Sequence, residues 1–255
     1  MGRKRSKVDE QIEGQLLLDF TSRSEYQVVQ ANKIISSKQK LRLASTKIIR
    51  AVIMQIKPED EKLHPYKITI RQLAGLLNIP ANNLYRDMQD IVKDIGSNPI
   101  FIRDDDKGKW KMIQWVSSCE YDKDGGLIIK LNDELQPYLL RLKSQYTQYQ
   151  YNNIFSMRSV YSIRMFELIL EQIHEKVIPK DGLIVKLSVQ YIKECLGCED
   201  NESYAKFSNF RARVIESSVK EINKKTFYSI DFSYEKSGRS ITGIIFYVNM
   251  KYNLW

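Results

Sequence analysis

The sequence predicts a mixed α+β fold in which one unit, a helix-turn-helix closed by a β-hairpin, occurs twice. Two observations predict this. The same order of helix, strand, helix, turn, helix and hairpin is found in both halves of the 255 residues. Equivalent positions also recur at an offset of 119 residues, which pairs Thr69 with Ser188 and Asn78 with Gly197. A repeat of this length indicates a duplicated domain rather than a solenoid.

The first copy is predicted from apolar periodicity and from its breakers. Its elements are a helix over 41–57, a strand over 66–70, a helix over 71–78, a helix over 84–96 and a hairpin over 100–103 and 110–116. Pro58 ends the first helix, and Thr69 can cap the second. The hairpin, whose tip is the charged stretch DDDKGK, is expected to close this core as the wing of a winged-helix domain.

The second copy repeats this order. Its elements are a helix over 158–176, a strand over 183–187, a helix over 189–197, a long helix over 207–225 and a hairpin over 227–236 and 241–250. Ser188 can cap the second of these helices, and Ser237 with Gly238 makes the turn of the hairpin. Both copies therefore predict winged-helix domains.

The chain divides into three predicted regions. Residues 1–30 are predicted to be a flexible N-terminal arm, 31–150 the first winged-helix domain, and 151–255 the second, which is expected to be the main DNA reader. The boundary is placed near residue 150 because LKSQYTQYQYNN, between the copies, is rich in Tyr, Gln and Asn.

Composition indicates a globular protein with a polyanionic partner. The net charge is +9 and the pI is about 9.2, which favours nucleic acid as the partner. No run of eighteen apolar residues is present, and the basic start GRKRSK leads into acids rather than an apolar signal, so we expect a cytoplasmic protein. Cys195 and Cys198 have no second pair nearby, so no zinc site is expected.

Two enzyme classes are disfavoured. A rolling-circle nicking enzyme needs paired histidines for its metal, but His64 and His174 are 110 residues apart. A helicase or ATPase needs a Gly-rich loop ending in Gly-Lys-Ser/Thr, which DDDKGKW does not supply. We expect no catalytic residue and no cofactor.

The long helix of the second copy carries a cationic stripe. At about 100° per residue, Lys206, Arg213, Lys220 and Lys224 fall in a narrow arc, and Asn209 lies at its edge. A neighbouring arc is apolar and can pack on a core; its members are Phe207, Phe210, Val214, Ile215, Ser218, Val219 and Ile222. Arg211 is predicted to project into that apolar arc, where it must extend to solvent or find an acid.

In both copies the helix after the turn is the one that a helix-turn-helix presents to the major groove. In the second copy the candidates for bases or nearby phosphates are Lys206, Asn209, Arg211 and Arg213, with Lys220 and Lys224 farther along the backbone. The first copy offers Asn82, Asn83, Tyr85 and Arg86. Its helix is made acidic by Asp87, Asp90 and Asp94, so weaker DNA binding, a protein interface and a purely structural role all stay open.

Two strings resemble the iteron-binding plasmid replication initiator (Rep) family. The first is S-x-Y-x-x-R-x-[FY]-E-L, carried by Ser159, Tyr161, Arg164, Phe166, Glu167 and Leu168. The second is F-x-x-R-V-[IL] followed by E-I-N, carried by Phe210, Arg213, Val214, Ile215, Glu221, Ile222 and Asn223. Their order within a duplicated chain is more specific than either string, and the likeness covers residues 30–250.

That resemblance implies two tandem winged-helix domains that are not enzymes. It implies monomers that bind direct repeats (iterons) of double-stranded DNA at a plasmid origin, and homodimers that repress their own gene at an operator. It further implies strand opening beside an A+T-rich segment and recruitment of the host initiator and helicase. The second domain supplies the main base contacts in that family. The alternative is a winged-helix transcriptional repressor without a replication role.

The arm contains one apolar cluster, QLLLDF at 15–20, in a segment otherwise too polar to fold alone. Its side chains either pack on the first domain, begin a short strand, or bind a partner. Gln15, Leu16, Leu18 and Phe20 resemble the short peptide by which bacterial replication proteins bind the sliding clamp.

Overall fold

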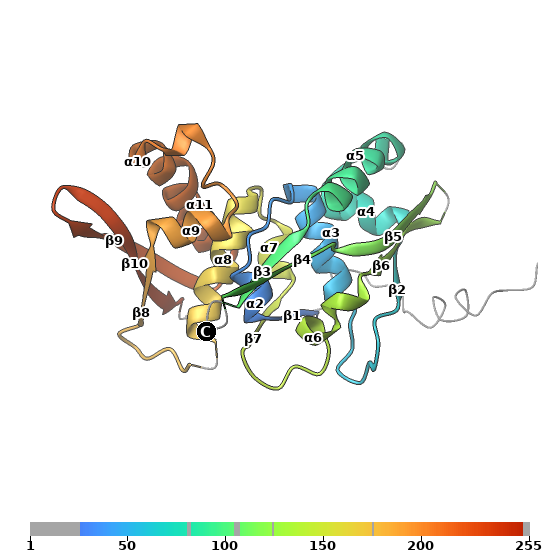
Figure 1. Ribbon diagram of the computed structural model, residues 1–255, viewed down its shortest axis with the longest axis horizontal. Helices are drawn as coiled ribbons and strands as arrows, with labels where there is room; N and C mark the ends of the chain where they lie inside the picture. The colour runs from blue at the N-terminus through green and yellow to red at the C-terminus, as the bar shows by residue number, and fades with distance from the viewer. Residues whose placement is uncertain (1–25, 81–82, 105–107, 124, 175, 252–255) are drawn as a thin grey trace, which may run out of the picture.

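The computed structural model describes residues 26–80, 83–104, 108–123, 125–174 and 176–251. Figure 1 shows two α+β units side by side, joined by helices at the centre. This arrangement confirms the predicted fold class, with one helix-turn-helix in each unit.

The two helices of the helix-turn-helix in the first unit lie where the sequence predicts, whereas the helix predicted over 41–57 ends at Ile53, so Pro58 is not what ends it. Helix α3 spans Leu43–Ile53 and packs behind the helix-turn-helix formed by α4 (Ile70–Leu77) and α5 (Leu84–Ser97). Thr69 caps α4 in a reciprocal capping box with Gln72, and Asn78 ends it in the left-handed conformation at φ 56°. Leu73, Leu84 and Met88 then close the core between these helices.

The sheet of the first unit differs from the prediction. Its three strands have the order β2 (Pro65–Ile68), β6 (Gly126–Leu131), β5 (Val116–Asp122), so the wing is the β5–β6 hairpin. The expectation that 100–103 and 110–116 form this wing is therefore wrong. One strand of each hairpin, β4 and β5, has partly alternating polar and apolar residues, so alternation alone does not select between the hairpins. Strand β6 reaches β2 because Gly126, at φ 102°, lies so close to Ile68 that a Cβ atom would sit 2.2 Å from its carbonyl oxygen.

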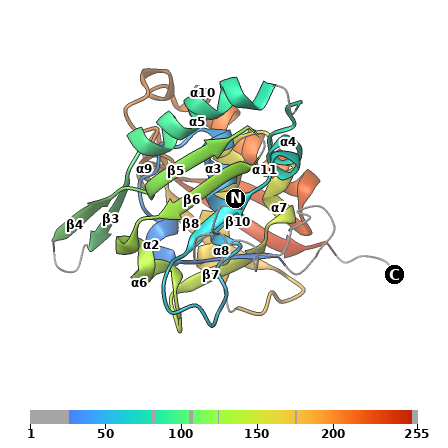
Figure 2. The ribbon, with the colours of Figure 1, turned by 90° about the vertical axis from the view of Figure 1, so that its right-hand side faces the viewer.

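The displaced hairpin forms a two-stranded sheet of its own. It consists of β3 (Ile100–Asp104) and β4 (Lys109–Ile113), and a single bridge links Phe101 to Lys38. Ile100, Ile102 and Ile113 are buried, whereas Trp110 is 70% exposed. Figure 2 shows this hairpin standing away from the body of the protein.

The chain between the copies is a strand rather than an open linker. Strand β7 (Tyr146–Gln150) pairs antiparallel with β1 (Gln27–Ala31), which is followed by α2 (Asn32–Ile35). Strand β1 includes residues 27–30, the end of the predicted arm. Two short helices flank β7; they are α6 (Gln136–Leu139) and α7 (Asn152–Phe155).

The second unit follows the predicted order closely. Helix α8 (Val160–Ile173) leads into β8 (Leu183–Ser188) and α9 (Val189–Cys195), which Ser188 caps by accepting a hydrogen bond from the Tyr191 amide at 3.1 Å. The hairpin of β9 (Tyr228–Ser237) and β10 (Ser240–Met250) pairs with β8 in the order β8-β10-β9. The predicted second wing is thus confirmed, but its turn is formed by Gly238 and Arg239, one residue later than predicted, because Ser237 pairs with Ser240.

Candidate DNA-binding surface

The helix after the second turn is built from three consecutive segments. They are α10 (Phe207–Phe210), a π-helical turn (Arg211–Glu216) and α11 (Ser217–Lys225), which we call the second reader helix. The predicted apolar arc is confirmed, because Phe210, Val214, Ile215, Ser218 and Ile222 are fully buried. The predicted cationic stripe is exposed to solvent at Lys206, Arg213, Lys220 and Lys224.

Arg211 extends to solvent and finds an acid, the two outcomes that the sequence analysis predicted for it. It is exposed, and its Nε atom lies 3.2 Å from Oε1 of Glu216. The prediction assumed an uninterrupted α-helix, in which residues five apart differ by about 140° in direction. A π-helical turn is wider, so its first and sixth residues stack along one side. The wider turn therefore brings the side chains of Arg211 and Glu216 close together.

The second reader helix is fixed at both ends by polar side chains. Near its start, Asn209 donates a hydrogen bond to the Ser203 carbonyl oxygen at 3.0 Å, and Lys193 lies 5.1 Å from the centre of the Phe210 ring. Near its end, Asn223 exchanges two hydrogen bonds of 2.7 Å with the backbone of Ile230 in β9. Asn209, which the sequence predicted to contact DNA, therefore forms a hydrogen bond within the protein.

Most residues of the second family string, F-x-x-R-V-[IL] followed by E-I-N, make contacts within the protein. Glu221 accepts hydrogen bonds from the amides of Arg158 and Ser159, at 2.7 and 3.2 Å, just before α8. Phe210, Val214, Ile215 and Ile222 are buried, and Asn223 binds β9. Arg213 is the one member of that string that is exposed, and within the described part of the chain it has no ion pair or hydrogen bond.

The second wing adds two cations that the sequence interpretation did not select. Lys236 and Arg239 are exposed on either side of the turn at Gly238, which has φ 59°. Tyr234 of the wing stacks edge-on against Phe207 with ring centroids 5.8 Å apart, so the wing is anchored to the second reader helix. The sequence feature that could have identified these two cations is a pair of basic residues on either side of Ser237-Gly238.

In the first copy, α5 is the reader helix, and its surface is different. Tyr85 is 60% exposed and contacts Tyr121 of β5 with ring centroids 6.0 Å apart. The Arg86 Nε atom lies 3.1 Å from Oδ1 of Asp87. Asn83 is exposed just before the helix, whereas Asn82 lies outside the described residues.

Asp94 does not contribute to the acidic surface predicted for α5. It is buried, accepts a hydrogen bond from the Arg42 amide at 2.9 Å, and is also bound by Asn98 at 3.0 Å. The exposed face therefore carries Asp87 and Asp90 but not Asp94, so it is less acidic than predicted. The first and second reader helices lie on the same side of the molecule in both views (Figures 1 and 2).

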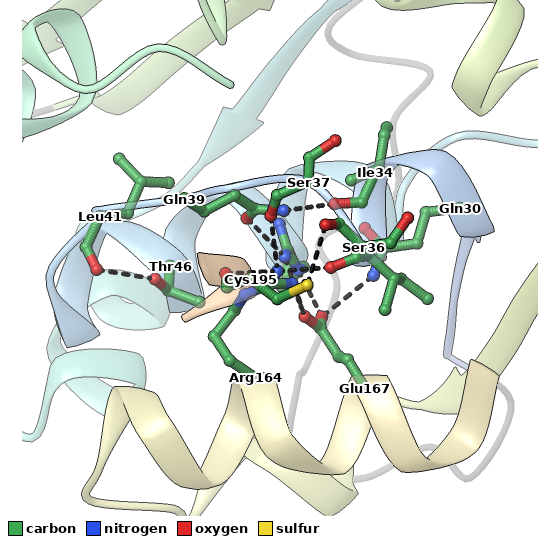
Figure 3. A network of polar contacts seen from close by, with 12 residues as sticks. Gln30, Ile34, Ser36, Ser37, Gln39, Leu41, Thr46, Arg164, Glu167 and Cys195 are labelled. Atoms are coloured by element: carbon green, nitrogen blue, oxygen red, sulfur yellow. Dashed lines mark hydrogen bonds and ion pairs between the residues drawn. The ribbon is translucent and has the colours of Figure 1, made fainter. Parts of the chain in front are cut away.

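A buried ionic network joins the first copy to α8. Both carboxylate oxygens of Glu167 are bound by Arg50 of α3, at 2.6 and 3.0 Å, and Arg164 lies 2.6 Å from Oε2. Gln30 and Tyr149 donate to Oε1 at 3.0 and 2.6 Å. Figure 3 shows Gln30 and Arg164 beside the Glu167 carboxylate. Burial by itself would raise the pKa of Glu167, but the two guanidinium groups hold that pKa at about 2.

Arg164 extends the network toward the second helix-turn-helix (Figure 3). Its Nη2 atom donates to the carbonyl oxygens of Ile35 and Ser37 in the first copy, at 2.5 and 3.1 Å, and to that of Cys195 at the end of α9, at 3.3 Å. The first family string therefore serves the contact between the copies. Its members Arg164, Phe166, Glu167 and Leu168 are all buried.

Other kinds of site find little support in the described residues. There, no group of three or more His, Cys, Asp or Glu side chains could hold a metal ion. Within the same residues, no helix is long and apolar enough to span a bilayer. The three cysteines are free thiols. The predicted clamp-binding residues Gln15, Leu16, Leu18 and Phe20 lie outside the described residues.

Comparisons with known proteins show which family this chain is similar to. A family model described as "Initiator Replication protein, WH1" matches residues 27–170, and one described as "Initiator Rep protein, WH2" matches 188–248. An Escherichia coli replication initiation protein is 25% identical over 231 residues, covering 89% of this chain and 71% of its own. The PI protein of Escherichia coli is 26% identical over 234 residues, covering 77% and 75%. The crystal structure of domains 2 and 3 of RctB covers 96% of this chain and 99% of that one, at 8% identity and a TM-score of 0.43.

Proposed function

The chain belongs to the Rep3 family of plasmid replication initiators, which are winged-helix DNA-binding proteins and not enzymes, and we propose that it initiates replication in the cytoplasm by binding iterons at its plasmid origin. The observation that carries this proposal is the position of Arg213. It is the exposed member of a family string whose other residues hold the second reader helix in place. A free guanidinium at that position is suited to a base edge or a phosphate in the major groove.

The arrangement of the two reader helices supports binding as a monomer to one iteron. Two such helices on the same side of one chain can address successive major grooves, about 34 Å apart. The buried Glu167 network supports this, because it holds α3 of the first copy to α8 of the second. Each bound chain should therefore protect about two helical turns of DNA.

Origin opening and recruitment of the host initiator and helicase complete the proposed role. The first reader helix supports a protein contact better than the second does, because its Arg86 is paired and Tyr85 is exposed. The strands should separate in the A+T-rich DNA beside the iterons, because chains bound to the iterons would bend the duplex there.

Autorepression as a homodimer is a further part of the proposal. The β3–β4 hairpin supports it, because the hairpin projects from the body and exposes Trp110 and Met112, at 70% and 50%. Large apolar side chains with this exposure are typical of association surfaces. A second copy of this chain is the proposed occupant, bound through the edge of the hairpin.

The test is a nuclease footprint of the purified chain over the DNA that flanks its own gene, with Arg213→Ala as control. We expect protection of direct repeats, each about two helical turns long, that Arg213→Ala weakens. Protection of a lone palindrome would instead identify a transcriptional repressor without a replication role. A protected length of about ten base pairs per bound chain would contradict simultaneous binding by both reader helices.

A further inference from the structure

One acid stands within the cationic stripe of the second reader helix. Residues 206–225 contain two acids, of which Glu221 is turned inward to bind the Arg158 and Ser159 amides. Glu216 is exposed and follows Arg213 by three residues and precedes Lys220 by four, a spacing that places it on their side of the helix. On a surface that approaches phosphates, a carboxylate opposes binding to every DNA sequence.

The carboxylate of Glu216 is held in place. Arg211 contacts its Oε1 atom at 3.2 Å, and the π-helical turn makes this pairing of residues five apart feasible. The side chains of Arg211 and Glu216 are 45% and 47% exposed, so both can still reach solvent or a ligand. An exposed ion pair of this kind adds little to stability. The pairing therefore orients Glu216 more than it stabilises the fold.

In the major groove, a carboxylate has few acceptable partners. Guanine presents acceptors at N7 and O6, and thymine presents an acceptor at O4. Adenine presents its N6 amino donor next to the N7 acceptor, which repels a carboxylate, whereas the exocyclic amino group of cytosine is the donor that Glu and Asp bind. Oε1 of Glu216 is already engaged by Arg211, so Oε2 is the oxygen left to accept such a donor. The cost of placing a negative charge near phosphates is then offset best at a cytosine.

Resting on the proposed function, we infer that Glu216 is a specificity-determining residue that accepts a hydrogen bond from a cytosine amino group in the major groove, with Arg211 as the residue that positions it. Glu216 thereby favours the cognate repeat by direct contact. It disfavours other sequences, because there its charge meets acceptors and phosphates without compensation.

The test is selection of binding sites from a randomised duplex library by the wild-type chain, Glu216→Gln and Arg211→Ala. Glu59→Gln is the matched control, since Glu59 is exposed in the loop between α3 and β2, on the opposite side from both reader helices in Figure 1. We expect Glu216→Gln to lose a preference for cytosine of roughly tenfold at one position and to keep the other preferences. Arg211→Ala should reduce the preference for cytosine at the same position, and Glu59→Gln should select the same sites as the wild type.

Binding curves on the selected site and on a scrambled duplex separate the remaining explanations. Glu216→Gln should bind the scrambled duplex about two- to fivefold more tightly, with a salt slope steeper by about one unit, while binding to the selected site falls. If Glu216→Gln bound both duplexes more tightly by the same factor, the effect of Glu216 would be a general electrostatic one, and the inference would be overturned. An unchanged selection profile would overturn it too, as would a wild-type chain that selects no sequence. A selected site that is absent from the DNA beside the gene would refute the proposed function but leave the base contact standing.

Discussion

The two reader helices occupy the same place in their copies but present different surfaces. The second exposes Lys206, Arg213, Lys220 and Lys224, with no ion pair at Arg213 among the described residues. The first exposes an aromatic residue, Tyr85, and an arginine that Asp87 already neutralises. The buried sides of both helices are mostly apolar, although α5 also buries Asp94. We propose that the different surfaces reflect a division of roles, in which the second copy reads DNA.

The largest effect should come from breaking the network that fixes one copy against the other. Glu167→Gln leaves Arg50 and Arg164 buried without their shared carboxylate, so the free energy of unfolding should fall by about 3–5 kcal/mol. Urea unfolding followed by circular dichroism measures this. The control is Glu194→Gln, which removes an exposed pair with Arg103 and should cost about 0–1 kcal/mol. Equal costs for the two variants would contradict a central role for Glu167.

The loss of stability caused by Glu167→Gln should depend on pH. The folded pKa of Glu167 is about 2, below the 4.5 of an ordinary glutamate, so its contribution to stability is present above about pH 4.5 and is lost as pH falls toward 2. The difference in unfolding free energy between wild type and Glu167→Gln should therefore shrink across that interval. A difference that stays constant there would mean that the carboxylate is not held ionised.

The comparison of the reader helices is tested directly by matched alanine variants. Arg213→Ala and Lys206→Ala should weaken binding to the cognate repeat by about 1–3 kcal/mol if they contact bases, whereas Arg86→Ala and Asn83→Ala should have smaller effects. Arg86 is already paired with Asp87, so its removal changes the local charge less. Fluorescence anisotropy at several salt concentrations measures both affinity and salt slope. Larger losses from the first-copy variants would reverse the assignment.

The β3–β4 hairpin is a third surface, at which we expect a contact with protein rather than with DNA. Trp110→Ser together with Met112→Ser should raise the dissociation constant of the homodimer about tenfold, because exposed aromatic anchors dominate association energies. Sedimentation equilibrium gives that constant. Ile184→Ser, at a side chain 63% exposed on β8, is the matched control and should leave dimerisation unchanged. A similar shift from Ile184→Ser would contradict a specific role for the hairpin.

The smallest effect is expected from the arm. A peptide of residues 10–25 should bind the sliding clamp with modest affinity, since it must become ordered on binding. Calorimetric titration measures this, with the Gln15→Ala, Leu18→Ala and Phe20→Ala triple variant as control. No heat from the native peptide, or equal binding by the variant, would refute the motif and leave the cluster as packing.

Local patterns in the sequence determined where the main helices lie and how α4 and α9 begin. Thr69 and Ser188 cap α4 and α9 as predicted, because capping depends on side chains within three residues of the cap. The periodicity of 207–225 likewise identified the buried and exposed sides of the second reader helix. The offset of 119 residues exposed the duplication, and two short strings were enough to suggest the family.

Tertiary structure alone decided which hairpin became the first wing, which acid Arg211 pairs with, which way Asp94 points, and what the first family string does. Each depends on partners distant in sequence or on helix geometry: Gly126 fits against Ile68, Asp94 binds the Arg42 amide, and Glu167 meets Arg50 across 117 residues. Periodicity assigns a residue to a side of an ideal helix, but a π-helical turn changes that side. The energy that chooses among such arrangements comes from contacts between distant segments, which no local pattern records.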